Sequence, residues 1–220
     1  MTLIDLSHEI FDGLVTYKGL PAPLICDYWS RESSAANYDD GESFQIGKIE
    51  MVANTGTYLD CPFHRYEDGH DCAALPLENC CDLDAVVIRA PFQKVGMAID
   101  ESFFKGKNLR DKAVLVQTDW SEHWNTEGYF AEGHPFLTAS AAAFLVAEGV
   151  KLVGIDSYNI DDTRRRTRPV HTILLRANIL IVEHMSNLSA LPDDGFVFSA
   201  VPPKFRGVGT FPVRAIAKIV

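Results

Sequence analysis

The sequence predicts an α/β fold, or an α+β fold if hairpins dominate, because short apolar runs alternate with segments of helical spacing. Five runs rich in β-branched residues are bounded by turn-forming residues, as buried strands are. They cover residues 85–89, 113–117, 152–155, 179–183 and 213–220. No internal repeat and no linker rich in proline, glycine or serine divides the 220 residues, so we expect one domain over residues 1–220.

The segments between these runs carry their own local signals. Residues 27–45 are polar and are expected to form a loop or an arm over the core. Short helices are predicted at residues 100–104 and 170–176. The segment LTASAAAFLVAEGV predicts a longer helix, with Thr138 as its N-cap and Gly149 as its stop before the strand KLVGID. This helix joins two predicted strands, which is the crossover unit of α/β folds.

Composition and charge exclude several classes of function. The formal net charge of −10 opposes binding to a phosphate backbone, which requires a strongly basic face. The amino-terminal MTLIDLSHEI lacks the basic start and apolar run of a signal peptide, and no segment is apolar enough to span a membrane. The five cysteines lack the paired spacing of a zinc ribbon or a disulfide scaffold. We therefore expect a cytoplasmic protein with a small-molecule substrate and with no nucleic-acid or membrane partner.

The stretch NTGTYLDCPFH combines a tight turn with ionisable side chains. It follows the apolar stretch IGKIEMVA, so its polar groups are expected at the end of a strand, and Gly56 permits a tight backbone turn there. Asp60 and His64 are four residues apart with Pro62 between them, which favours a turn entering a new helix. Both side chains could face one pocket. Alternatively, Asp60 caps that helix and His64 lies on the surface.

A second polar stretch joins two predicted strands. The strand that ends at Asp156 leads through a charged loop to His171, and the next strand ends at Glu183. Ligands bind at strand ends and the loops beyond them in α/β folds. A carboxylate at the end of a buried strand needs a cation, a metal or hydrogen-bond donors. His171 and Glu183 therefore either belong to a site or serve only as a helix residue and an ion-pair partner.

The charged loop before His171 contains a basic patch, Arg164, Arg165, Arg166 and Arg168. A guanidinium group can bind a substrate carboxylate through two parallel hydrogen bonds, and Arg166 is our candidate for this role. In the alternative reading, these arginines pair with the nearby Asp161 and Asp162 in a solvated or subunit-bridging loop.

Several blocks taken together resemble one family, the cyclase family of metal-dependent hydrolases, which includes bacterial kynurenine formamidase (arylformamidase) and isatin hydrolase. The blocks are DLSHEI, GTYLDCPFH, VQTDWSEHW, HPFLTASAAAFLVAEGVKLVGIDSYNID, IVEHMSNL and FPVRAIA, in this order along the chain. The resemblance implies a swivelling β/β/α-type fold with a mixed sheet. It also implies a homodimer or homotetramer with active sites near subunit contacts.

The resemblance also implies a site. The family pattern His-x-Gly-Thr-His-x-Asp-x-Pro-x-His reads here with Asn54 and Tyr58 in place of its two leading histidines, which are metal ligands. The other positions are retained, with Asp60, His171 and Glu183 as metal ligands and His64 as the acid/base residue. An amide oxygen and a protonated phenol are poor ligands. We therefore expect one divalent ion, Zn²⁺ or Mn²⁺, or none.

The function expected from this site is hydrolysis of a non-peptide carbon–nitrogen bond, as in an arylformamidase or a cyclic-amide hydrolase. His64 would transfer protons, Tyr58 would donate to a developing oxyanion, and Asn54 would contact the substrate. Two alternatives stay open: a metal-free lyase or cyclase that uses the same acids and bases, and a binding protein that keeps the pocket without turnover.

Overall fold

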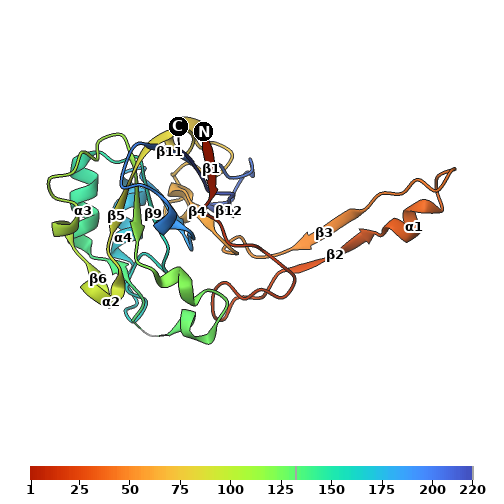
Figure 1. Ribbon diagram of the computed structural model, residues 1–220, viewed down its shortest axis with the longest axis horizontal. Coiled ribbons are helices and arrows are strands. Elements are labelled where there is room, and N and C mark those ends of the chain that lie inside the picture. The colour runs from red at the N-terminus through yellow and green to blue at the C-terminus, as the bar shows by residue number, and fades with distance from the viewer. Residues whose placement is uncertain (132, 220) are drawn as a thin grey trace.

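The computed structural model describes residues 1–131 and 133–219, and within them a nine-stranded mixed sheet forms the centre of the molecule (Figure 1). The strand order is β1-β13-β11-β5-β7-β9-β10-β4-β12. The strands are β1 (Thr2–Asp5), β4 (Tyr58–Asp60), β5 (Leu83–Arg89), β7 (Ala113–Gln117), β9 (Leu152–Ile155), β10 (Leu180–Glu183), β11 (Phe196–Ser199), β12 (Thr210–Pro212) and β13 (Ile216–Ile219). The predicted α/β class with a mixed sheet is confirmed.

The direction of the strands changes across the sheet. The central strands β5, β7, β9 and β10 run parallel, and antiparallel strands flank them on both sides. Strand β4 lies between β10 and β12, so that Tyr58 is opposite Glu183 and Asp60 is opposite Thr210. This register brings together residues that are more than 120 positions apart in the chain.

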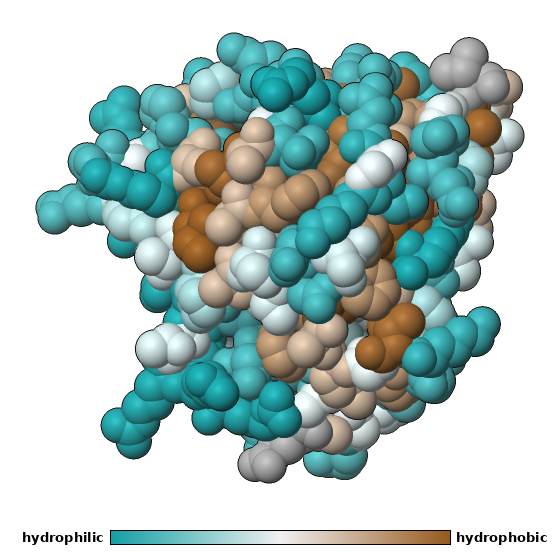
Figure 2. Space-filling view, turned by 90° about the vertical axis from the view of Figure 1, so that its left-hand side faces the viewer, coloured by the Kyte–Doolittle hydropathy of each residue, from teal (hydrophilic) through white to brown (hydrophobic). Residues whose placement is uncertain are grey.

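Two hydrophobic cores lie on the two faces of the sheet. Helices α3 (Ala139–Glu148) and α4 (Pro169–Arg176) cover one face, where Leu145 and Leu174 pack with Val153. The second core contains side chains from all nine strands of the sheet or from residues that flank them. The sheet therefore curls around this core. Figure 2 views the side on which α3 lies, where a band of hydrophobic side chains crosses a largely hydrophilic surface.

The predicted end signals of α3 are confirmed. The Thr138 hydroxyl accepts a hydrogen bond from the Ala141 amide at 3.2 Å, and Gly149 ends the helix with a φ of 75°. The helix predicted over residues 100–104 is only a 3₁₀ turn, η3 (Glu101–Phe103), which Asp100 caps. Five residues between a two-residue strand and a loop are too few to propagate an α-helix.

The predicted polar loop or arm is an arm, but it does not lie over the core. Strands β2 (Leu24–Trp29) and β3 (Ile46–Glu50) pair antiparallel and project from the body with α1 (Arg31–Ala35) near the tip (Figure 1). Every residue of β3 is exposed. The apolar stretch IGKIEMVA therefore belongs to the arm, and the strand that carries the site is β4.

Shorter elements complete the chain: α2 (Phe92–Val95), β6 (Ala98–Ile99) paired with β8 (Phe136–Leu137), η1 (Pro62–His64), η2 (Leu77–Asn79), η4 (Trp120–His123), η5 (Glu127–Phe130) and η6 (Leu188–Ala190). The strand predicted over residues 213–220 is limited to β13, and residue 220 lies outside the described residues. None of the described helices has the length and hydropathy needed to cross a membrane. That residues 1–220 form one domain and that the protein is cytoplasmic stay predictions.

Candidate active site

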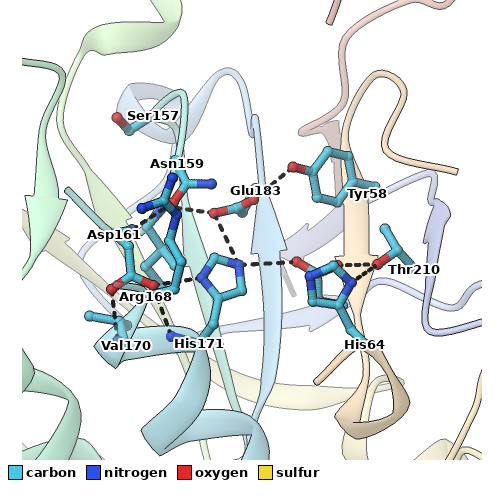
Figure 3. A network of polar contacts seen from close by, with 12 residues as sticks. Tyr58, His64, Ser157, Asn159, Asp161, Arg168, Val170, His171, Glu183 and Thr210 are labelled. Carbon is cyan, nitrogen blue, oxygen red and sulfur yellow. Dashed lines mark hydrogen bonds and ion pairs between the residues drawn. The ribbon is translucent and has the colours of Figure 1, made fainter. Parts of the chain in front are cut away.

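A cavity of about 310 Å³ opens beside strands β4 and β10. Its lining consists of Tyr17, Leu20, Asn54, Tyr58, Asp60, His64, Arg65, Asn159, Arg168, His171 and Glu183. All of the candidate site residues from the sequence are among them except Arg166, whose side chain is exposed outside the lining. The arginine of the basic patch that does line the cavity is Arg168. Figure 3 shows His171 below Glu183, with His64 to the right of His171 and Tyr58 to the right of Glu183.

Two glycines allow the loops around the cavity to approach one another. Gly56 has a φ of 67°, and a Cβ there would lie 2.6 Å from Ile10 Cγ1. A Cβ on Gly209 would lie 2.6 Å from the Cα of His64, and the Gly209 carbonyl accepts a hydrogen bond from the Cys61 amide at 2.9 Å. The loop that carries His64 is therefore fixed against the start of β12. Asp60 lies in β4 and does not cap a helix, so the alternative reading of Asp60 as a cap is wrong.

Asp60 presents an unsatisfied carboxylate oxygen to the cavity. Its Oδ1 accepts a hydrogen bond from the Thr210 hydroxyl, whereas its Oδ2 is buried and has no hydrogen-bond partner among the described residues. That Oδ2 lies 3.5 Å from His171 Nε2, and Glu183 Oε1 lies 3.7 Å from the same nitrogen. A buried carboxylate oxygen without a partner is costly, so this arrangement calls for a cation or a proton between the three groups.

His171 is held by a carboxylate on its other side. Asp161 is fully buried, and its Oδ2 accepts hydrogen bonds from His171 Nδ1 at 2.7 Å and from the His171 amide at 3.0 Å. Its Oδ1 accepts from the Val170 amide at 2.8 Å. These contacts fix the first turn of α4 and direct His171 Nε2 toward Asp60 and Glu183. Figure 3 shows the contact between His171 and Glu183. A carboxylate behind a histidine in this way is typical of metal sites.

His64 has a defined tautomer when it is neutral. Thr210 has a single hydroxyl hydrogen, and this hydrogen is donated to Asp60. The Thr210 oxygen, 2.8 Å from His64 Nδ1, must therefore accept a hydrogen bond from that nitrogen. His64 Nε2 then carries a lone pair, and its side chain is 31% exposed. This nitrogen can act as a base for a group in the cavity.

Tyr58 belongs to a buried chain of hydrogen bonds. Its hydroxyl donates to Glu183 Oε2 at 2.7 Å and lies 3.3 Å from His184 Nε2, while His184 Nδ1 lies 2.7 Å from the Tyr129 hydroxyl. Burial lowers the pKa of His184 to about 3, so this imidazole is neutral. One assignment satisfies every group: Tyr129 donates to His184, His184 donates to Tyr58, and Tyr58 donates to Glu183.

Burial and charge shift the pKa values of the site. Burial raises the pKa of Glu183 to about 7, with a contribution from Asp60 and opposition from His171. Burial would also raise the pKa of Asp60, but His171 and the nearby His64 lower it below its usual value. Burial lowers the pKa of His171, yet the carboxylates of Glu183, Asp161 and Asp60 outweigh it and raise this pKa to about 10. Positive charge between these groups is therefore strongly favoured.

The side chains around His171 Nε2 have the spacing and the ligand types that a divalent metal ion requires. A four-coordinate Zn²⁺ with bonds of about 2.0–2.2 Å holds its ligand atoms roughly 3.3–3.6 Å apart, close to the 3.5 Å and 3.7 Å separations around His171 Nε2. Asp60, His64 and His171 also each offer a ligand atom within 4.8 Å of the others. One imidazole with two carboxylates is a set that Zn²⁺ and Mn²⁺ accept.

Comparison with known proteins places the chain in a family. The family model described as "Putative cyclase" matches residues 4–162. The chain belongs to this cyclase family. Curated relatives span nearly its whole length: the chain is 29% identical over 222 residues to a kynurenine formamidase of Bacillus cereus, covering 98% of this chain and 96% of the relative. It is 30% identical over 220 residues to the kynurenine formamidase of Bacillus cytotoxicus, with the same coverage.

Solved structures of the cyclase family share the fold. Isatin hydrolase A from Labrenzia aggregata matches with a TM-score of 0.84 at 21% identity, covering 99% of this chain and 93% of that protein. A structure described as a potential metal-dependent hydrolase with cyclase activity matches with a TM-score of 0.77 at 23% identity, covering 98% and 96%. The sequence-based resemblance to this family of hydrolases is thus confirmed.

Sequence reasoning missed three residues that support the site. Thr210, which joins Asp60 to His64, is separated from both by about 150 positions and carries no local signal. The sequence suggests Asp161 only as a partner of the arginine patch, but Asp161 is buried and accepts a hydrogen bond from His171. Asp162 is the residue that pairs with Arg164. His184 follows Glu183 directly, and its position at the end of an apolar run was the one available clue.

Proposed function

We propose that this chain hydrolyses a non-peptide carbon–nitrogen bond of an amide, in the manner of an arylformamidase or a cyclic-amide hydrolase. The observation that carries the proposal is the unpartnered Asp60 Oδ2 facing His171 Nε2, next to the free Nε2 of His64. In such a site a position for a cation lies next to a general base, and amide hydrolysis uses both. The names of the relatives, kynurenine formamidase and isatin hydrolase, support the same class of reaction.

We propose that Asp60, His171 and Glu183 hold one divalent ion, Zn²⁺ or Mn²⁺. When bound, such an ion supplies Lewis-acid polarisation of a carbonyl and activation of water near neutral pH. A second ion is not expected, because burial raises the pKa of Tyr58 well above its ordinary value and keeps its phenol protonated. Asn54, the other replacement for a family histidine, offers only a neutral amide.

His64 is the proposed acid/base residue. With its Nδ1 hydrogen donated to Thr210, its Nε2 can accept a proton from the attacking water and later return it to the leaving nitrogen. Asp60 lies 3.6 Å from His64 Nδ1 and stabilises the imidazolium that forms in between. The two residues are therefore coupled through Thr210, and the proton has a defined acceptor atom.

Tyr58 and Asn54 also line the cavity. The Tyr58 proton is donated to Glu183, so its first role is to stabilise the Glu183 carboxylate, and it can donate to a substrate oxyanion only after leaving Glu183. Asn54 is half-buried at the cavity wall, where its amide can contact the substrate. Both assignments stay predictions.

A metal-free lyase or cyclase is the second candidate, and one observation favours it. The carboxylates around His171 raise its pKa to about 10, so a proton can replace a metal ion at the same position. A cationic His171 with neutral His64 forms an acid/base pair whose ring centroids are 5.8 Å apart. Dependence of turnover on added metal separates the two candidates.

We further infer that the chain forms a homodimer or homotetramer through its arm. An isolated two-stranded ribbon is only marginally stable in water, and this ribbon exposes large apolar side chains. They are Leu24, Tyr28, Trp29, Ile46 and Ile49, each between 43% and 69% exposed. A second copy of the same chain could cover these apolar side chains, and it is available wherever the protein is made.

The test of the proposed function is hydrolysis of an aryl formamide, such as formanilide, and of a cyclic aryl amide, with and without added Zn²⁺ or Mn²⁺. We expect turnover, and a loss of about 10²–10⁴-fold in kcat for His64→Ala with unchanged circular dichroism. His70→Ala serves as the control, because His70 is exposed and lies outside the cavity. Wild-type turnover by His64→Ala, or no hydrolysis under any metal condition, would overturn the proposal.

A further inference from the structure

We propose that a second cavity, separate from the candidate active site, binds a small organic cation that carries a primary ammonium group. This cavity has a volume of about 370 Å³ and shares no lining residue with the cavity that holds Asp60 and His171. None of the proposed catalytic or metal-binding residues lines it, so binding there is independent of amide hydrolysis.

The second cavity lies at the carboxyl ends of the parallel strands β7, β9 and β10. Asp119 lies two residues after the end of β7, Asp156 directly follows β9, and Ser186 lies three residues after β10. The segment after β1, which carries His8, forms another part of the wall. In α/β folds this edge of a parallel sheet is where ligands bind, so the position suits a binding site.

Two buried polar atoms in the wall have no hydrogen-bond partner among the described residues. They are His8 Nε2 and the hydroxyl oxygen of Ser186. Ser186 is only 8% exposed, and its amide donates a hydrogen bond to the Leu6 carbonyl at 2.9 Å. The His8 ring is held by stacking on Trp124, with ring centroids 3.9 Å apart. Because a buried polar atom without a partner is costly, both atoms call for a polar group inside the cavity.

The charged side chains around the cavity are carboxylates. They belong to Glu9, Asp119, Glu122 and Asp156, and none of the four forms an ion pair with another described residue. Asp156 accepts hydrogen bonds from the amides of Thr118 at 2.7 Å and Asp119 at 3.0 Å, and burial raises its pKa to about 7. The other three carboxylates therefore supply most of the negative charge, which attracts a cation.

His8 in the wall is an acceptor and not a competing cation. Burial lowers its pKa to about 4, so the imidazole is neutral near pH 7 and adds no positive charge to the cavity. A primary ammonium group has three N–H donors, which is enough for His8 Nε2, the Ser186 hydroxyl and one carboxylate. Hydrogen bonds of this kind, in which the donor is charged, are stronger than those between neutral groups.

The arrangement favours an organic cation over a metal ion. Within the described part of the chain, the one group of three or more ligand residues close enough to share an ion is Asp60, His64 and His171, which lie in the other cavity. The carboxylates of the second cavity form no such group. A cavity of about 370 Å³ is also much larger than a single ion and can hold a short carbon chain with its ammonium group.

The test measures binding by calorimetry to the metal-loaded protein at physiological ionic strength, where long-range attraction between exposed charges is screened. The probes are butane-1,4-diamine, its fully methylated bis-ammonium counterpart and butane-1,4-diol. The methylated compound keeps the charge without N–H donors, and the diol has hydroxyl donors without the charge. We expect the diamine to bind at least tenfold more tightly than either compound. No binding of the diamine at millimolar concentration would overturn the proposal.

Four variants locate the bound diamine. We expect Ser186→Ala and Asp119→Asn each to weaken binding about tenfold. Asparagine tolerates the φ of 67° at position 119, so the second variant should fold. Glu127→Gln removes one exposed carboxylate outside the cavity and is the control for net charge, and Asp60→Asn is the control for binding in the candidate active site. Both controls should bind the diamine as the wild type does. An equal loss in Glu127→Gln and Asp119→Asn, or loss of binding in Asp60→Asn, would overturn the second site.

Urea unfolding without the diamine separates a ligand-binding role of Ser186 from a structural one. Removing a buried hydroxyl that has no partner should leave the free energy of unfolding unchanged or raise it. Weaker diamine binding by a variant that is as stable as the wild type would therefore support the proposal. Loss of stability in Ser186→Ala with unchanged diamine affinity would show that the hydroxyl serves the fold and would contradict the site.

Discussion

His64 Nδ1 lies 2.8 Å from the hydroxyl oxygen of Thr210, and this contact leaves His64 Nε2 as the nitrogen that is free to take a proton. The tautomer follows because the only hydrogen of that hydroxyl is donated to Asp60. One threonine thus connects a candidate base with a candidate metal ligand, and the register between β12 and β4 places it there.

Replacing Thr210 tests this connection. In Thr210→Val, Asp60 Oδ1 loses its donor and His64 loses the acceptor that fixes its tautomer, so we expect kcat to fall about 10–100-fold while KM changes little. Thr210→Ser keeps the hydroxyl and should retain most of the rate. Steady-state kinetics on both variants provides the check, and equal rates for valine and serine would contradict the assignment.

Asp161 is expected to control metal affinity. In Asp161→Asn the charge behind His171 is lost, so we expect the metal to bind about 10–100-fold more weakly. Competition with a chromophoric chelator measures this without any substrate. Asp162→Asn is the matched control, because Asp162 pairs with Arg164 and does not contact His171. Equal affinities of the wild type and Asp161→Asn would show that this carboxylate is not part of the metal site.

Restoring the family histidines should create a second metal position. The double variant Asn54→His with Tyr58→His replaces an amide and a protonated phenol by imidazoles in the cavity that Asp60 also lines. Metal content should rise from about one to about two equivalents per chain in elemental analysis. Each single variant should gain less. A double variant that folds and still holds one ion would show that these two positions do not limit the metal count.

His8 makes stability depend on pH. Burial lowers its pKa from 6.5 to about 4, so the unfolded chain binds a proton before the folded chain does as the pH falls. The stability that the neutral imidazole contributes is therefore complete above pH 6.5 and is lost between pH 6.5 and 4. The ring stacks on Trp124 with centroids 3.9 Å apart. We expect His8→Gln to lose less stability over this interval than the wild type, as measured by urea unfolding; an equal slope would contradict the pKa.

The arm should control assembly. Sedimentation velocity should show a dimer or a tetramer for the wild type, and Tyr28→Asp with Ile49→Asp should shift it toward the monomer, because two charges would enter an apolar contact. Neither residue lies in the nine-stranded sheet or its cores, so most of the secondary structure measured by circular dichroism should be retained. A wild-type monomer at micromolar concentration would contradict the inference.

The parallel strands were predictable because their signals are local. The strands β7 and β9 have the predicted bounds, and α3 begins and ends at its predicted capping residues. The arm was harder to predict, since β3 has an apolar sequence but is exposed throughout. Apolar composition alone therefore gave the wrong location for this stretch.

The lining of the candidate site was predictable only where the chain places ionisable residues within a motif. Asp60 and His64 belong to one short motif, and His171 and Glu183 lie at predicted element ends. The choice of Arg166 over Arg168 could not be made from sequence, because both belong to one loop and only the fold determines which side chain reaches the cavity. The position of Thr210 opposite Asp60 depends on the register between β12 and β4, which is set by long-range strand pairing and has no local sequence signal.

The most direct test of the central claim is the metal content of the protein, purified without chelator or affinity metal and analysed by elemental analysis before and after incubation with Zn²⁺ and Mn²⁺. A site formed by Asp60, His171 and Glu183 predicts about one equivalent per chain. No bound metal after incubation would contradict the metal-dependent hydrolase, and two equivalents would contradict the loss of the second position at Asn54 and Tyr58.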